Sequence, residues 1–91
     1  MSLLARKYVV RGRVQGVGFR HFVWQVAGRL GVRGYVRNLE DGSVEVHATG
    51  TAGNLDELEA LLRQGPPWAD VHHLDIQEAA PTANKNFRIE R

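Results

Sequence analysis

Apolar and polar residues repeat with two different periods along the first third of the chain. Over residues 6–14 they alternate with a period of two, which predicts a β-strand with one buried face. That face carries Tyr8, Val10, Gly12 and Val14, and the opposite face is partly polar. Over residues 20–30 the apolar positions take helical spacing instead, which predicts an amphipathic helix. Its apolar stripe comprises Phe19, Val23, Val26, Ala27 and Leu30, and Gly31 follows as a stop.

The remainder of the chain also alternates between strand-like and helix-like patterns of apolar residues. Residues 33–39 and 44–48 read as two strands of a hairpin, joined by a turn at Glu40-Asp41-Gly42. Asn54, with Glu57 three residues later, is predicted to cap a second helix that ends at Gly65-Pro66-Pro67. Its buried stripe is predicted to be Leu55, Leu58, Leu61 and Leu62. Residues 72–76 read as a fourth strand, with Val71 out of phase, and 87–89 as a short last strand after a loop.

The order of these elements predicts the fold class. A β-α-β-β-α-β succession with a short final strand is the ferredoxin-like split βαβ pattern of α+β proteins. We therefore expect an antiparallel sheet with two helices on one face. Ninety-one residues suffice for one modest core, so residues 1–91 are expected to form a single domain.

Composition narrows the range of function classes. The chain has no cysteine, which excludes disulfides, a thiolate nucleophile and a Cys-based zinc site and favours a cytoplasmic protein. No apolar run is long enough to span a membrane. Charge is uneven: residues 1–39 carry eight Lys/Arg and no acid, whereas residues 40–91 carry four Lys/Arg and ten Asp/Glu. The basic part would attract an anionic substrate or nucleic acid, or would simply be solvated surface.

A glycine-bearing turn, Val14–Arg20, lies between the first strand and the first helix. Gly16 and Gly18 let the backbone approach a ligand, and the uncapped N–H groups of the helix point toward the same place. Arg20 stands in the first turn, where the helix dipole disfavours a cation, so an anion bound beside it would explain its position. The spacing matches neither a Walker loop nor a dinucleotide fingerprint.

Two motifs together resemble the acylphosphatase family. The first is Val10-x-Gly12-x-Val14-Gln15-Gly16-Val17-x-Phe19-Arg20. The second is Gly34-Tyr35-Val36-Arg37-Asn38, three residues, Gly42-x-Val44, five residues, Gly50. Both motifs are intact, and the resemblance extends over nearly the whole chain.

The resemblance implies hydrolysis of acyl phosphates, the mixed anhydrides of a carboxylic acid and phosphate, without a metal, a cofactor or a phosphoenzyme. Arg20 and Asn38 match the family's catalytic arginine and asparagine. The phosphate-binding positions are Gln15, Gly16, Val17, Gly18, Phe19 and Arg20. We expect the acyl phosphate substrate and the product phosphate as ligands, no nucleic acid or membrane partner, and a monomer.

Each candidate taken alone has a simpler explanation. Arg20 would be a surface arginine and Asn38 a turn residue, and only the two motifs together favour catalysis. The four histidines are expected to be structural or surface residues. Helical rotation turns His21 about 100° from Arg20, His47 is a polar strand position, and His72 and His73 point to opposite faces of a strand.

Two alternatives stay open on the sequence. RNA-recognition domains share the fold, and Arg33-Gly34-Tyr35 begins like their sheet motif, but Val36 and Arg37 stand where that motif needs Gly/Ala and Phe. The motifs also occur in domains of larger carbamoyl-transfer proteins that mature hydrogenases. Because this chain carries no additional domain, we expect a free enzyme.

Overall fold

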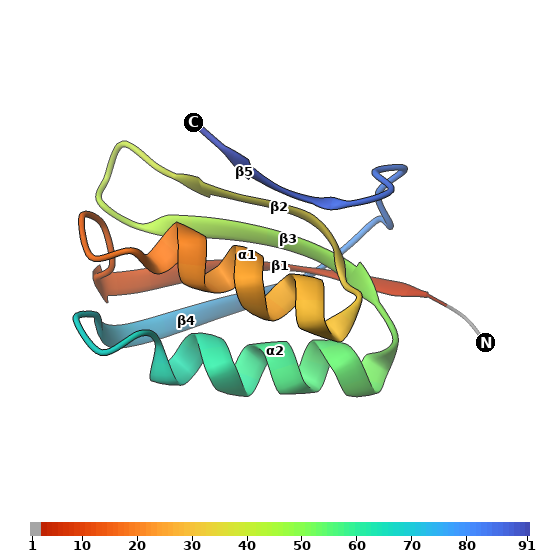
Figure 1. Cartoon of the computed structure of the whole chain (residues 1–91), viewed down its shortest axis with the longest axis horizontal. Helices are drawn as coiled ribbons and strands as arrows, with labels where there is room; N and C mark the ends of the chain where they lie inside the picture. Colours follow the sequence, from red (N-terminus) through yellow and green to blue (C-terminus); the bar gives the residue numbers. More distant parts are fainter. Residues whose placement is uncertain (1–2) are drawn as a thin grey trace.

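The computed structural model describes residues 3–91 (Figure 1). The elements follow in the order β1 (Leu4–Arg13), α1 (Phe19–Leu30), β2 (Arg33–Asn38), β3 (Val44–Gly50), α2 (Ala52–Gln64), β4 (Asp70–Ala79) and β5 (Phe87–Glu90). This succession confirms the predicted ferredoxin-like βαββαβ fold with a short final strand. No helix in the described part is long and apolar enough to cross a bilayer.

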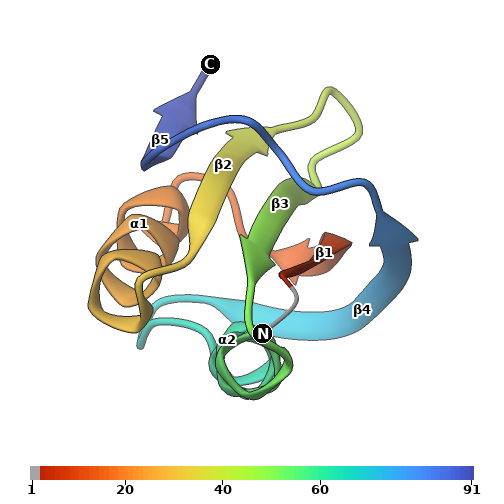
Figure 2. The ribbon, with the colours of Figure 1, turned by 90° about the vertical axis from the view of Figure 1, so that its right-hand side faces the viewer.

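The five strands form one sheet in the order β4-β1-β3-β2-β5. β1 pairs antiparallel with β3 and β4, and β2 pairs antiparallel with β3, but β2 and β5 are parallel. The prediction of a purely antiparallel sheet is therefore wrong at one edge. The chain leaves β4 at one edge and crosses the end of the sheet to reach the other, as Figure 2 shows. It therefore enters β5 at the end of the sheet where β2 begins.

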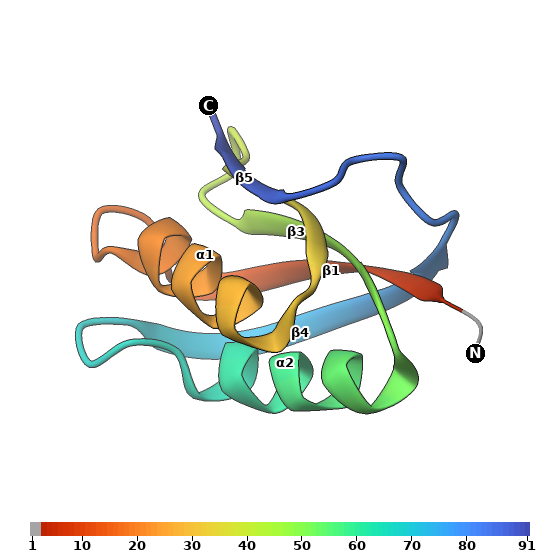
Figure 3. The same ribbon diagram turned by 45° about the vertical axis from the view of Figure 1, so that its right-hand side comes forward.

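Both helices cover the same face of the sheet, as predicted (Figure 3). The core lies between them and the sheet. Tyr8 and Val10 of β1, Val23 of α1 and Leu58 of α2 are fully buried there. Leu61 is only partly buried at the edge of this core. Each Å² of apolar surface removed from water stabilises the fold by about 25 cal/mol, so this layer is the main source of stability.

The second helix begins earlier than predicted, and Asn54 is not its cap. Thr51 has the extended backbone of an N-cap residue, and its Oγ1 accepts the N–H of Asn54 at 3.2 Å. The side chain of Asn54 instead donates to the carbonyl oxygen of Leu30 at 2.9 Å. Asn54 therefore links the start of α2 to the end of α1.

A register shift explains why Val71 falls out of phase. Arg11 pairs with His73, but Gly12 pairs with Val71, so His72 is an extra residue in β4. Such a bulge bends its strand and reverses the inward and outward alternation. β4 is longer than predicted at both ends: pairing with β1 resumes beyond the bulge at residues 70–71, and it continues through residues 77–79 at the other end. The other boundaries agree with the predictions to within two residues.

Candidate active site

The loop between β1 and α1 has the backbone that the glycines were expected to provide. Gly16 and Gly18 have φ of 73° and 78°, in the left-handed region that favours glycine. Gly18 is the N-cap of α1 and has no side chain to cap it. The first helical bond runs from the N–H of Phe22 to Gly18. The N–H groups of the three preceding residues have no helical partner and are available to an anion.

Gln15 contributes its side chain in a way that the sequence did not predict. Its Nε2 donates to the carbonyl oxygens of Leu39, at 2.8 Å, and Ser43, at 2.9 Å. These residues flank the turn between β2 and β3, which lies at the same end of the molecule as the glycine loop (Figure 1). The side chain of Gln15 thus faces the turn, while its backbone belongs to the loop. A partner 24 residues away leaves no local signal in the sequence.

The guanidinium of Arg20 is held by the last strand. Its Nη1 donates to the carbonyl oxygen of Glu90 in β5 at 3.2 Å. Among the described residues, no carboxylate lies within 4.0 Å of Arg20. Because guanidinium has five N–H donors, four of them are left for a ligand.

Asn38 ends β2, where it pairs with Val44. Within residues 3–91 its Oδ1 is buried and has no hydrogen-bond partner. Buried acceptors without a donor are rare in native proteins, because losing the bond to water costs about 1–3 kcal/mol. The amide of Asn38 therefore marks a place for a bound donor such as water.

Arg20 and Asn38 line the same cleft, which has a volume of about 220 Å³. It is lined by Val14, Gly16, Gly18, Phe19, Arg20, His21, Asn38 and Ile89. Of the predicted phosphate-binding positions, Gln15 and Val17 do not line it: Gln15 is turned to the β2–β3 turn, and Val17 packs against the core. Only their backbone groups remain as possible phosphate ligands.

Three residues of the cleft were not among the predicted site residues: Val14, His21 and Ile89. His21 is exposed, as expected, but it also lines the cleft and stacks on Trp24 with ring centroids 5.7 Å apart. The rotation of about 100° per helical residue had predicted that His21 points away from Arg20. Ile89 reaches the cleft from β5. Its strand is too short for a periodic pattern to show which side of the sheet it faces.

The turn behind Asn38 is fixed by a charged group. The side-chain hydroxyl and the backbone N–H of Ser43 donate to Asp41, and Arg11 lies 3.1 Å from the same carboxylate. The bonds from Ser43 are the largest cause of the lowering of the Asp41 pKa to about 2. The ionised form is therefore the one that holds the turn together.

The remaining histidines lie outside the cleft. His72 and His73 each contact a different carboxylate, Asp70 at 2.9 Å and Asp75 at 2.8 Å. His47 stacks on Tyr35 on β2, and its Nδ1 is buried without a partner among the described residues. In residues 3–91, no three His, Asp or Glu side chains are grouped closely enough to hold a metal ion.

Comparison with known proteins agrees with the two motifs. The family model described as "Acylphosphatase" matches residues 6–89. The chain belongs to the acylphosphatase family. It is 53% identical over 85 residues to the acylphosphatase of Solibacter usitatus, covering 93% of this chain and 88% of that protein. The acylphosphatase of Pasteurella multocida is 50% identical over 78 residues, covering 86% of this chain and 87% of that one.

Solved structures of acylphosphatases have the same fold. The crystal structure from Bacillus subtilis superposes with a TM-score of 0.93 at 34% identity, covering 97% of this chain and 99% of that chain. The chain also superposes on part of HypF from T. kodakarensis, at 32% identity and a TM-score of 0.84, but covers only 12% of that larger chain. As an acylphosphatase, this protein is an enzyme that hydrolyses acyl phosphates.

Proposed function

We propose that the cleft between the glycine loop and Asn38 hydrolyses acyl phosphates without a metal or other cofactor. One observation carries the assignment. Asn38, whose Oδ1 is buried and unpartnered among the described residues, lines the same small cleft as Arg20 and the two left-handed glycines. This arrangement supports an anion site beside a site for a hydrogen-bond donor, as attack of water on a phosphoryl group requires.

Arg20 and the loop supply the anion site. The guanidinium offers a planar, two-pronged contact to two phosphoryl oxygens. The N–H groups of residues 15–20 face the remaining charge, and the positive end of the α1 dipole adds to them. Preorganised donors of this kind stabilise the charge that builds up on the phosphoryl oxygens during transfer.

Asn38 supplies the water site. Its Oδ1 accepts a hydrogen from the attacking water and leaves a lone pair of that water directed at phosphorus. The water oxygen bonds to phosphorus, the bond between phosphorus and the acyl oxygen breaks, and its electron pair leaves on the carboxylate. The proton of the water passes to the product phosphate or to solvent. Carboxylate is a good leaving group, so no side-chain acid is needed.

The test is phosphate release from benzoyl phosphate before and after dialysis against EDTA. We expect unchanged rates, and p-nitrophenyl phosphate to be a poor substrate because its phenolate is a worse leaving group. Activity that disappears in EDTA and returns with Mg²⁺ or Zn²⁺ would overturn the metal-free mechanism.

A monomer is the proposed active form, acting in the cytoplasm. Support comes from the cleft, because the side chains proposed for catalysis all come from one chain. Sedimentation velocity run alongside an activity titration tests this. Specific activity that rises with protein concentration, together with a dimer, would contradict it.

A further inference from the structure

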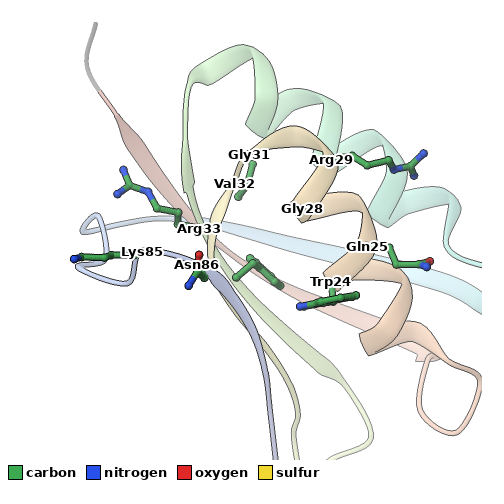
Figure 4. Close-up of a pocket in the computed structure, with 10 residues that line it drawn as sticks. Trp24, Gln25, Gly28, Arg29, Gly31, Val32, Arg33, Lys85 and Asn86 are labelled. Carbon is green, nitrogen blue, oxygen red and sulfur yellow. The ribbon is translucent and has the colours of Figure 1, made fainter.

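A second, larger depression lies beside the cleft. This groove has a volume of about 840 Å³ and runs along α1 and the segment that leads into β5 (Figure 4). Its walls include Trp24 and Gly28 from α1, Arg33 from the start of β2, and Lys85 and Phe87 from the C-terminal segment. Sites for small molecules have volumes of about 300–1,000 Å³, so the groove is large enough for one.

The groove continues the line of the cleft. Along α1, Arg20 lines the cleft, whereas Trp24 and Gly28, one and two turns further on, line the groove. Along β5, Ile89 lines the cleft, and Phe87, two residues earlier and on the same face, lines the groove. The two depressions therefore lie end to end along the seam between α1 and β5.

Their spacing suits one extended ligand. At a rise of 1.5 Å per residue, Gly28 lies about 12 Å along the helix from Arg20. The contact between His21 and Trp24 joins the two depressions, because His21 lines the cleft and Trp24 the groove. A molecule whose phosphoryl group is bound at Arg20 can thus extend past Trp24.

The charges in the groove indicate what the far end of that molecule carries. Its lining includes Arg29, Arg33 and Lys85 and no Asp or Glu. In the described part of the chain, none of these three cations has a carboxylate within 4.0 Å, whereas Arg37 pairs with Glu45 at 2.8 Å. In Figure 4 Arg33 and Lys85 are on the same side of the groove, beyond Asn86, with the ends of their side chains directed outward, whereas the side chain of Arg29 points away on the opposite side. Arg33 and Lys85 thus form a cationic end to the groove.

The middle of the groove is aromatic. The indole of Trp24 is 45% exposed, although a side chain of this size is usually more deeply buried. In Figure 4 it extends from α1 toward the side of the groove that carries Asn86. It offers apolar surface to the stem of a ligand whose charged end lies further on.

We propose that this groove is the subsite for the acyl group, and that it selects acyl phosphates whose extended acyl group ends in a second anion. The proposal rests on the proposed function, since it requires the phosphoryl group at Arg20. The acyl stem packs on Trp24, and the remote carboxylate is bound by Arg33 and Lys85. Selectivity among acyl phosphates is thus set by residues that do not touch the phosphoryl group.

Synthetic acyl phosphates separate length from charge. We compare the monoacyl phosphates of succinic, suberic and sebacic acids with octanoyl phosphate, which has a neutral end. We expect kcat/KM to rise with length in the dicarboxylic series, and the longer members to exceed octanoyl phosphate. In the double variant Arg33→Gln/Lys85→Gln, the preference for suberoyl over octanoyl phosphate, which have the same chain length, should fall about fivefold, since exposed ion pairs are worth about 1 kcal/mol. The change should appear in KM rather than kcat, because these contacts are remote from the reacting bond.

Two further variants make the test specific. Arg29→Gln removes a cation of the same groove whose side chain points away from Arg33 and Lys85. In this variant the preference for the anionic over the neutral acyl phosphate should stay at the wild-type value. Trp24→Ala should weaken the binding of sebacoyl and octanoyl phosphates alike. A preference unaffected by the double variant, or lowered as much by Arg29→Gln, would overturn the subsite, as would equal rates for neutral and anionic long chains. Wild-type hydrolysis of benzoyl phosphate tests the proposed function separately from the groove.

Discussion

Gln15 donates its side-chain amide to the carbonyl oxygen of Leu39 at 2.8 Å. Leu39 directly follows Asn38, so this bond joins the glycine loop to the residue beside the proposed water site. A second bond from the same amide to Ser43 spans the turn. The distance between the anion site and Asn38 is therefore set by one side chain as well as by the sheet.

Replacing Gln15 by Leu should separate the binding of phosphate by the loop from the positioning of Asn38. The backbone N–H groups remain, so phosphate should bind nearly as before, but the carbonyls of Leu39 and Ser43 each lose one of their two donors. We expect kcat on benzoyl phosphate to fall at least tenfold and the free energy of unfolding to fall by about 1–2 kcal/mol. Kinetics and urea titration measure both. Gln77→Leu, at an exposed position of β4, is the control. An equal loss of kcat and stability in that variant would contradict a specific role for Gln15.

Arg20→Ala should remove phosphate binding together with rate, because in the proposed mechanism the guanidinium contacts the substrate before and during the reaction. Arg20→Lys should restore little, since ammonium cannot make the forked contact. Inorganic phosphate at a hundred times its dissociation constant should stabilise the wild type by about 2.7 kcal/mol. Thermal melts with and without phosphate measure this, with the exposed Arg13→Ala as control. Equal stabilisation of Arg20→Ala and wild type would refute the assignment.

Asn38→Ala should affect the chemical step alone. Its neutral amide should add little to the binding of a dianion, whereas in the proposed mechanism it positions the attacking water. We expect kcat to fall about a hundredfold or more, with the inhibition constant of phosphate nearly unchanged. Asn38→Asp should be no better, because it adds negative charge near the substrate. If kcat holds while phosphate inhibition weakens, Asn38 is a binding residue instead.

The lowered pKa of Asp41 predicts how stability depends on pH. Folding favours the ionised carboxylate, so its contribution is fully present above the unfolded pKa near 3.8 and is lost as pH falls toward about 2. Asp41→Asn keeps an acceptor oxygen but removes the charge. Urea unfolding should therefore find the variant less stable than wild type at pH 6, with the difference shrinking between pH 4 and pH 2. A difference independent of pH would contradict the role of the charge.

Sequence reasoning found what local pattern and intact motifs can show. The sequence pattern located all seven elements, six of them because burial on one face repeats along the element, whereas β5 is too short to show a repeat. It misplaced the cap of α2 because Thr51 and Asn54 are both good cap residues, and only the extended backbone of Thr51 decides between them. Pairing across long sequence separations, such as β2 with β5, leaves no such pattern.

The candidate site was also predictable only in part. Arg20 and Asn38 were predicted from their places in two motifs, and the structure brings both to one cleft. The bonds that position them could not be predicted, because Arg20 is held by a backbone carbonyl of β5 and Gln15 by carbonyls beyond Asn38. A carbonyl is present in every residue, so its identity as a partner carries no sequence signal.

The strand that holds Arg20 is synthesised after every other element described. β5 cannot join β2 through a tight hairpin, because the two strands are parallel. The carbonyl of Glu90 that holds Arg20 thus reaches α1 only after the chain has crossed from β4 to the opposite edge of the sheet. The place of Arg20 in the proposed phosphate site therefore depends on a parallel strand pairing, which needs a long connection rather than a local turn.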